Sequence, residues 1–182
     1  MLVPLRFQAS PVPEGPRDAI QLLLDCHRRI RTFCDLAVKV ARLADLPAAE
    51  RAEAATRVER YFTVALPRHV EDEEVLLAYR LWEAGPSTAV LVALEDMSWQ
   101  HLDIEGLLKS LVPRWRLLGE APERHGGLAR ELERDSVRLA GLMETHLWLE
   151  ELVLFPEARA RLSPESMESL GAEMRARRGT KP

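Results

Sequence analysis

Hydrophobic residues recur at three- and four-residue steps along most of this chain. The first such stretch runs from Pro16, which suits a first helical turn, to Pro47. Its apolar stripe comprises Ile20, Leu23, Leu24, His27, Ile30, Cys34, Ala37, Val38 and Ala41. This spacing predicts a long amphipathic helix with a histidine in the middle of its apolar face.

Three further segments repeat this pattern. The second, about 48–84, carries Val58, Phe62, Ala65, His69, Glu73 and Leu76 on one stripe. The third, about 87–115, carries Val90, Leu94, Met97, His101, Ile104, Leu108 and Val112. The fourth follows Pro122 and carries Leu132, Leu139, Leu142, Met143, His146, Glu150 and Val153. Each spacing is helical, so the pattern predicts four long helices.

Proline, glycine and serine mark the expected boundaries. Pro67 can kink the second helix, Ser87 is a candidate N-cap of the third, and Pro113 is expected to end or bend it. The fourth is expected to reach Phe155-Pro156, and Ser163-Pro164 to begin a short fifth helix. Long helices with short connections favour an all-α fold, an antiparallel up-down-up-down four-helix bundle.

The two ends of the chain differ in composition from its middle. Residues 1–15 hold Pro4, Pro11, Pro13 and Gly15, which predicts an extended N-terminal arm. We therefore divide the chain into an arm at 1–15, a four-helix bundle at 16–160, and a short C-terminal helix with a basic tail at 161–182.

Composition narrows the classes of function. The 182 residues are 47% hydrophobic and 30% charged, with a formal net charge of -4. Such a chain lacks the broad basic surface that nucleic-acid binding needs. We find no secretory leader or membrane-spanning stretch, so we expect a cytoplasmic protein. Cys26 and Cys34 lie too far apart on one helix for a disulfide, so we expect reduced thiols.

The strongest signal is a duplicated motif, H-x-x-x-E-E-x-x-L. It occurs at His69–Leu77 and again at His146–Leu154. Another histidine precedes each copy at similar range, His27 before the first and His101 before the second. A histidine and a glutamate four residues apart project from the same helix face, a geometry that suits ligands of one metal.

Folding should bring these histidines to a similar depth. Buried carboxylates and imidazoles are costly without a compensating cation, so the cluster predicts a metal site. We expect His27 and His69 to hold one ion and His101 and His146 the other. Four imidazoles and two shared glutamates would fill about eight of roughly twelve positions on two octahedral ions, and a bridging oxo or hydroxo group would fill two more, leaving room for a small diatomic or peroxide. Such ligands suit iron, with manganese or zinc as substitutes.

The pattern of two H-x-x-x-E-E copies, each after a distant histidine, resembles the hemerythrin-like or HHE cation-binding family over residues 16–160. The resemblance implies a non-haem di-iron centre with four histidine ligands and two bridging glutamates. Those residues are His27, His69, His101 and His146, with Glu73 and Glu150. Ferritin-like proteins use the reverse order, Glu-x-x-His.

Two positions depart from the oxygen-carrying members of that family. Where they have a fifth histidine, this chain has Glu105. Glu105 is either an additional ligand or is turned aside to a polar contact, and the sequence leaves both open. Glu151 competes with Glu150 as the last carboxylate, but the repeated four-residue step favours Glu150. His125, at a helix junction, is expected to be exposed.

These observations support three functional hypotheses. The first is a protein that binds oxygen or a related small oxidant, for sensing, scavenging or iron handling. The second is an enzyme that reduces peroxide or nitric oxide, or repairs iron centres, at the same site. The third is an adaptor or structural bundle in which the metal only stabilises the fold. A sensing role would need self-association, giving a homo-oligomer, or a separate protein partner.

Overall fold

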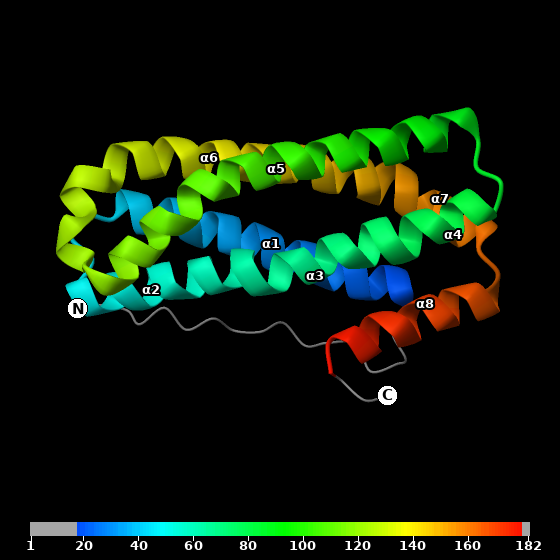
Figure 1. Ribbon diagram of the computed structural model, residues 1–182, viewed down its shortest axis with the longest axis horizontal. Coiled ribbons are helices and arrows are strands. Elements are labelled where there is room, and N and C mark those ends of the chain that lie inside the picture. Colours follow the sequence, from blue (N-terminus) through cyan, green and yellow to red (C-terminus); the bar gives the residue numbers. More distant parts are fainter. Residues whose placement is uncertain (1–17, 180–182) are drawn as a thin grey trace.

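The computed structural model describes residues 18–179, which are helical over nearly their whole length and contain no strand (Figure 1). The all-α prediction is confirmed. The helices form five continuous stretches joined by short connections within this range. The predicted arm at 1–15 lies outside the described residues, as do positions 180–182 of the tail.

Three of the stretches are single α-helices. They are α1 (Ala19–Arg42), α5 (Thr88–Glu120) and the short α8 (Pro164–Arg177). The other two change helix type along their length. The second stretch comprises α2 (Ala48–Arg60), η1 (Tyr61–Ala65), α3 (Leu66–Glu71), η2 (Asp72–Leu77) and α4 (Ala78–Glu83). The fourth comprises η3 (Pro122–Arg124), α6 (His125–Leu149), η4 (Glu150–Leu154) and α7 (Phe155–Arg161). Of these, η1, η2 and η4 are π-helical.

Local sequence explains most helix ends. The Ser87 side chain accepts a hydrogen bond from the backbone N–H of Val90, which confirms the predicted N-cap. Ser163 caps α8 in the same way by accepting from Ser166, which confirms that the short fifth helix begins there. Gly85 lies between α4 and α5 with a φ of 69°, a conformation that glycine adopts without steric cost. Of the two alternatives expected at Pro113, an end of the helix is wrong, because α5 continues to Glu120. The end expected at Phe155-Pro156 is also wrong, because α7 continues to Arg161.

The long stretches pack against one another around a shared interior (Figure 1). Helix α1 contacts α2 and α6, while α5 contacts the same two helices. The fifth stretch, α8, lies against α1 and η2. Each stretch therefore has two long neighbours, which leaves one face of every amphipathic helix directed inward.

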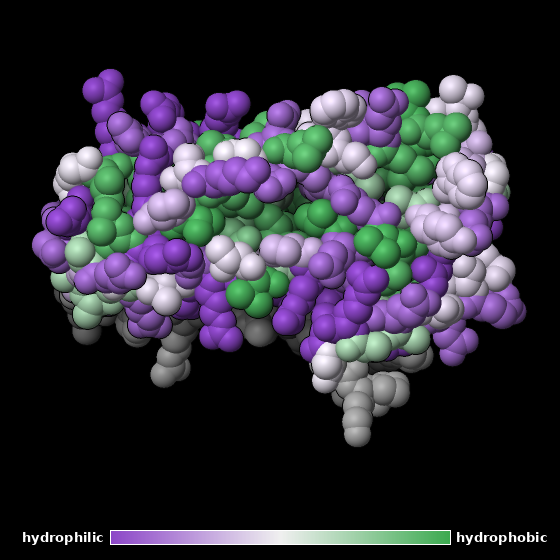
Figure 2. Space-filling view, in the orientation of Figure 1, coloured by the Kyte–Doolittle hydropathy of each residue, from purple (hydrophilic) through white to green (hydrophobic). Residues whose placement is uncertain are grey.

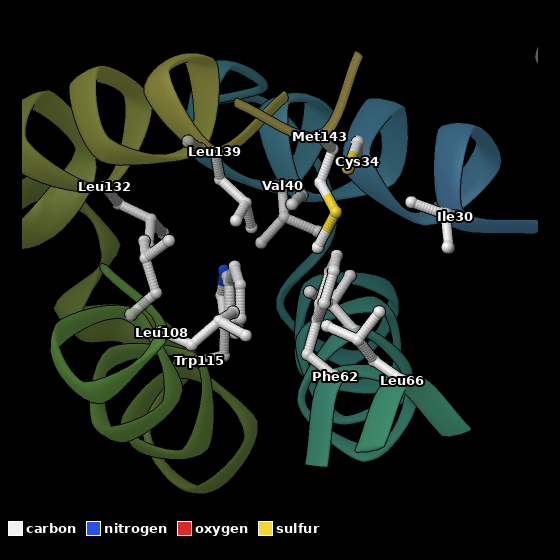
Figure 3. Packing of buried hydrophobic residues seen from close by; sticks show 14 of the residues in the cluster. Ile30, Cys34, Val40, Phe62, Leu66, Leu108, Trp115, Leu132, Leu139 and Met143 are labelled. Atoms are coloured by element: carbon white, nitrogen blue, oxygen red, sulfur yellow. The ribbon is translucent and has the colours of Figure 1, made fainter. Parts of the chain in front are cut away.

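The hydrophobic interior consists of two clusters of buried residues. Figure 3 shows one of them, which includes Ile30, Phe62, Trp115 and Leu139. The Phe62 and Trp115 rings stack there, with centroids 5.2 Å apart. The second cluster includes Ile20, Leu23, Leu77, Met97, Leu154 and Met174. His27, His69 and His101 each lie between residues of the two clusters along their helices, and Glu150 does so in the fourth stretch, so a polar layer separates two apolar ones.

His125 corrects one sequence-based expectation. Its side chain is buried, not exposed, and Nε2 lies 3.1 Å from the Val40 carbonyl oxygen and 2.8 Å from that of Ala41. An N–H at Nε2 can donate to both carbonyls, which belong to the last turns of α1. The prediction failed because His125 meets α1 only in the tertiary structure.

Within residues 18–179, no helix is long and apolar enough to cross a membrane.

Candidate metal centre

Six buried side chains form two potential metal-binding groups. One group contains His27 and His69, the other contains His101 and His146, and Glu73 and Glu150 belong to both. In each group, one ligand atom from every residue lies within 4.8 Å of the others. The structure therefore brings together the four histidines and two glutamates in the pairing expected from the sequence.

Glu73 lies between histidines of both groups. Its Oε1 is 2.8 Å from Nε2 of His69 and 3.7 Å from Nε2 of His27, while Oε2 is 3.5 Å from Nε2 of His101. Each carboxylate oxygen thus faces a different group. This is the arrangement that a carboxylate needs to bridge two ions.

Glu150, in the fourth stretch, also lies between histidines of both groups. Its Oε2 lies 3.2 Å from Nε2 of His27 and 3.5 Å from Nε2 of His146. Across the second group, Nε2 of His101 and Nε2 of His146 are 3.1 Å apart. All four imidazoles present Nε2 to the shared carboxylates or to each other, so the nitrogens converge on one small volume.

In three of the imidazoles, Nδ1 contacts an oxygen atom that determines which ring nitrogen carries the proton. Nδ1 of His27 contacts Glu151 Oε1 at 2.8 Å, and Nδ1 of His101 contacts Glu74 Oε1 at the same distance. Nδ1 of His146 lies 3.1 Å from Oε1 of Gln100. A carboxylate or amide oxygen can only accept, so each Nδ1 carries the proton. Each Nε2 then keeps a lone pair for a metal.

His69 is oriented differently. Its Nδ1 has no hydrogen-bond partner among the described residues, and the nearby group is the buried Cys26 thiol. Burial raises the pKa of the Cys26 thiol, but the neighbouring His69 imidazole, together with Arg178 and Arg29, lowers it overall. A sulfur is a weaker acceptor than a carboxylate.

The second glutamate of each motif copy reaches a different helix. Glu74 holds His101 on α5, and Glu151 holds His27 on α1. The π-helical turns η2 and η4 carry both glutamate pairs. Such turns are rare and occur frequently at functional sites. Each copy therefore supplies a histidine, a shared carboxylate and a carboxylate that orients another histidine.

The carboxylates and imidazoles strongly affect one another's protonation. Burial and the adjacent Glu73 raise the pKa of Glu150 to about 7. Burial lowers the pKa of His27, but Glu150 and Glu73 together raise it to about 9. Burial also lowers the pKa of His146, to about 3. A cation between the two carboxylates would relieve their repulsion directly.

The residues fit a pair of metal ions. Both oxygens of Glu73 and both of Glu150 are buried without a hydrogen-bond partner in the described part of the chain. A buried polar group left in this state costs about 1–3 kcal/mol, more if it is charged. Ligation would satisfy these atoms. Mixed imidazole and carboxylate donors suit iron, manganese or zinc.

Glu105 does not join this cluster. Its side chain is 60% exposed, and its Oε1 pairs with Lys109 Nζ at 3.0 Å on the same helix. Of the two alternatives left open by the sequence, the structure has the one in which Glu105 turns aside to a polar contact. The different position of Glu151, beside Nδ1 of His27, likewise places Glu150 and not Glu151 between the two groups.

Three residues that orient histidines were not predicted from the sequence. They are Glu74, Gln100 and Glu151, the last of which was considered only as an alternative to Glu150. Two other acidic residues close in sequence to the histidines have different partners: Glu144 pairs with Arg31, and Asp72 with Arg178. The second glutamate of each motif copy was the signal that could have revealed Glu74 and Glu151, because a carboxylate that does not itself bind the metal is available to orient a ligand histidine.

No protein-family model matches the chain, and no curated protein sequence matches it. The function must therefore be inferred from the site itself.

Proposed function

We propose that this chain is a hemerythrin-like protein that holds two iron ions and binds dioxygen or a related small oxidant. The observation that carries this proposal is the sharing of Glu73 and Glu150 between two histidine pairs. Four helical stretches contribute to the shared layer, which is consistent with an antiparallel up-down-up-down four-helix bundle. Iron at such a site would supply redox chemistry that amino-acid side chains lack.

The protein's own residues would perform three tasks. The four histidines and two glutamates would hold the ions, and Glu74, Gln100 and Glu151 would fix the imidazole rings. The apolar clusters on either side would keep bulk water away from the layer. Phe155 contributes directly, since its ring centroid lies 5.1 Å from that of His27.

We also propose that the protein acts in the cytoplasm, where its buried thiols would remain reduced. Cys26 and Cys34 are free in the structure, which is compatible with this location. We further propose that, in a sensing role, the signal is passed on by self-association or by a separate protein partner.

Metal analysis combined with absorption spectroscopy tests the proposal. The protein is reconstituted with ferrous iron without oxygen, and its spectrum is recorded before and after oxygen is admitted. Two tightly bound ions per chain and an absorption change that reverses when oxygen is removed are expected. Fewer than one tightly bound ion per chain would overturn the di-iron proposal.

Two further outcomes of the same experiment would change the assigned role. An irreversible spectral change together with turnover of hydrogen peroxide would make the protein a redox enzyme. Bound iron with no spectral response to oxygen, peroxide or nitric oxide would leave a metal that only stabilises the fold. Both outcomes would contradict oxygen binding.

A further inference from the structure

A cavity of about 640 Å³ reaches one side of the candidate metal centre. It lies between the second stretch and α5, with Met143 and His146 of α6 also in its lining. Of the four histidines in the two groups, only His101 and His146 line it. Figure 2 shows hydrophobic side chains gathered in a hollow between these stretches. The two ions would therefore differ in accessibility.

The size of the cavity exceeds what a diatomic molecule requires. One water molecule occupies roughly 30 Å³ of liquid, so the cavity is about twenty times larger. Pockets that bind organic molecules have volumes of about 300–1,000 Å³, which includes this one. An organic occupant is consequently better matched to the volume than dioxygen alone.

The lining is mainly apolar. It includes Phe62, Leu66, Val70, Leu108, Val112 and Met143. These side chains come from two helical stretches and α6, so they surround an occupant from several directions. Transfer of an apolar molecule into such surroundings is favoured in proportion to the apolar surface that it removes from water.

Charged groups in the lining select against anions. Glu71, Glu74 and Glu105 contribute three carboxylates, whereas Lys109 contributes the only ammonium group among the lining residues. Lys109 is moreover paired with Glu105. Glu71 also pairs with Arg177, which lies outside the lining. Among the lining residues themselves, an anionic ligand would still meet more carboxylates than ammonium groups, while an uncharged one would meet no charge penalty.

We propose that this cavity binds an uncharged, mainly apolar organic molecule whose single polar group lies beside His101 and His146. Long-chain alcohols and alkyl hydroperoxides belong to this chemical class. The apolar part would fill the space between the second stretch and α5. The orientation of the polar group towards an ion rests on the proposed function, but occupancy of the cavity does not.

Isothermal titration calorimetry with 1-decanol tests occupancy, with decanoate as the charged analogue. We expect saturable binding of one 1-decanol per chain and binding of decanoate at least about tenfold weaker. Val112→Phe fills part of the cavity and should weaken 1-decanol binding by about tenfold or more. Val92→Phe places the same substitution at an exposed position of α5 outside the cavity, and should leave binding unchanged.

In metal-free protein, where no iron attracts the carboxylate of decanoate, three results would overturn the inference: no saturable heat with 1-decanol, equal affinity for decanoate, or full affinity in a folded Val112→Phe protein. Circular dichroism of both variants establishes that they are folded. If Val112→Phe does not fold, Leu102→Phe at the exposed edge of the lining takes its place.

The titration is run on metal-free and iron-loaded protein. Binding of 1-decanol without tight iron binding would support the cavity and contradict the proposed function. Tight iron binding without 1-decanol binding would do the reverse. In iron-loaded protein, a shift of the iron absorption spectrum on addition of 1-decanol would support the proposed orientation, and binding without a shift would contradict it.

Discussion

Glu151 Oε1 lies 2.8 Å from Nδ1 of His27, which joins the fourth helical stretch to α1 at the edge of the candidate metal centre. Arg31 Nη1 contacts the same oxygen at 2.8 Å, and Arg31 also binds Glu144. The carboxylate is thus fixed from two sides. A histidine held in this way has one ring orientation before any metal binds, and its proton stays on Nδ1 when Nε2 gives up its own to a metal.

Removing this contact should weaken one of the two metal sites. We expect Glu151→Ala to reduce the affinity for one iron ion by about 10–100-fold, because His27 loses the acceptor that orients it. Glu151→Gln keeps an acceptor oxygen and should recover part of the loss. Competition with a chelator of known affinity measures the change. Glu144→Ala is the control, since it removes the other partner of Arg31 without touching His27; an equal loss there would contradict the prediction.

Replacing a glutamate that belongs to both groups should affect metal binding differently from replacing a histidine that belongs to one group. Glu150 belongs to both groups, so Glu150→Ala should weaken both ions, whereas His27→Ala should weaken mainly one. Metal content per chain after gel filtration separates these outcomes. Circular dichroism tests whether each variant is folded, and Glu150→Gln serves if the alanine variant is not. Two ions retained with full affinity in folded Glu150→Ala would show that the glutamate is not shared.

Glu105 should be dispensable for metal binding. Its pair with Lys109 is exposed, and such pairs contribute about 0–1 kcal/mol to stability. We therefore expect Glu105→Ala to retain two ions per chain and a nearly unchanged unfolding midpoint in urea. Loss of one ion would mean that the side chain rotates inward and ligates when metal is present.

His125 should matter for stability and not for the metal centre. Replacement by alanine removes its contacts to the Val40 and Ala41 carbonyls, and we expect a loss of about 1–3 kcal/mol in the free energy of unfolding. Urea denaturation measures the loss, and metal content should stay the same. Arg124→Ala alters the adjacent exposed residue and should change stability by less than about 0.5 kcal/mol. Similar stability of both variants would contradict the assigned contacts.

An ion pair between α5 and α6 predicts a pH dependence away from the metal centre. Asp135 contacts Arg134 and Arg114, and its pKa is lowered by Arg134 first, then by Arg114 against the effect of burial. Because the pKa is lower in the folded state, this stabilisation is present above the unfolded value near 3.8 and is lost as pH falls through the folded value.

Asp135→Asn should therefore lower the free energy of unfolding by about 1 kcal/mol at pH 7, and by less at pH 3. Urea denaturation at both pH values measures the difference. Glu131→Gln is the matched control, since Glu131 also contacts Arg114 but is 60% exposed. A constant effect of Asp135→Asn at both pH values would contradict the ionic origin of the stabilisation.

The helices and the residues of the candidate centre could be predicted because their signals are local. The three- and four-residue spacing of apolar positions defines each helix face, and His69 with Glu73 or His146 with Glu150 occupy one such face. His27 and His101 followed from their places in the same stripes. Capping by Ser87 and Ser163 depends on bonds to residues three positions away.

Contacts between helices could not be obtained in this way. The acceptors at Nδ1 of His27 and His101 lie 124 and 27 residues away in sequence, and the partner of His146 lies on α5. His125 was misjudged for the same reason. The π-helical turns at η2 and η4 also escaped prediction, because their wider backbone pattern is set by packing and leaves the sequence spacing unchanged.

The sequence by itself determined an all-helical chain and six side chains suited to a shared metal centre, because helix periodicity is a property of neighbouring residues. Tertiary structure alone decided that Glu105 turns to Lys109, that Glu151 orients His27, and that, of the four histidines in the two groups, His101 and His146 line the cavity. Each of these depends on which rotamer or space remains once helices distant in sequence have packed together.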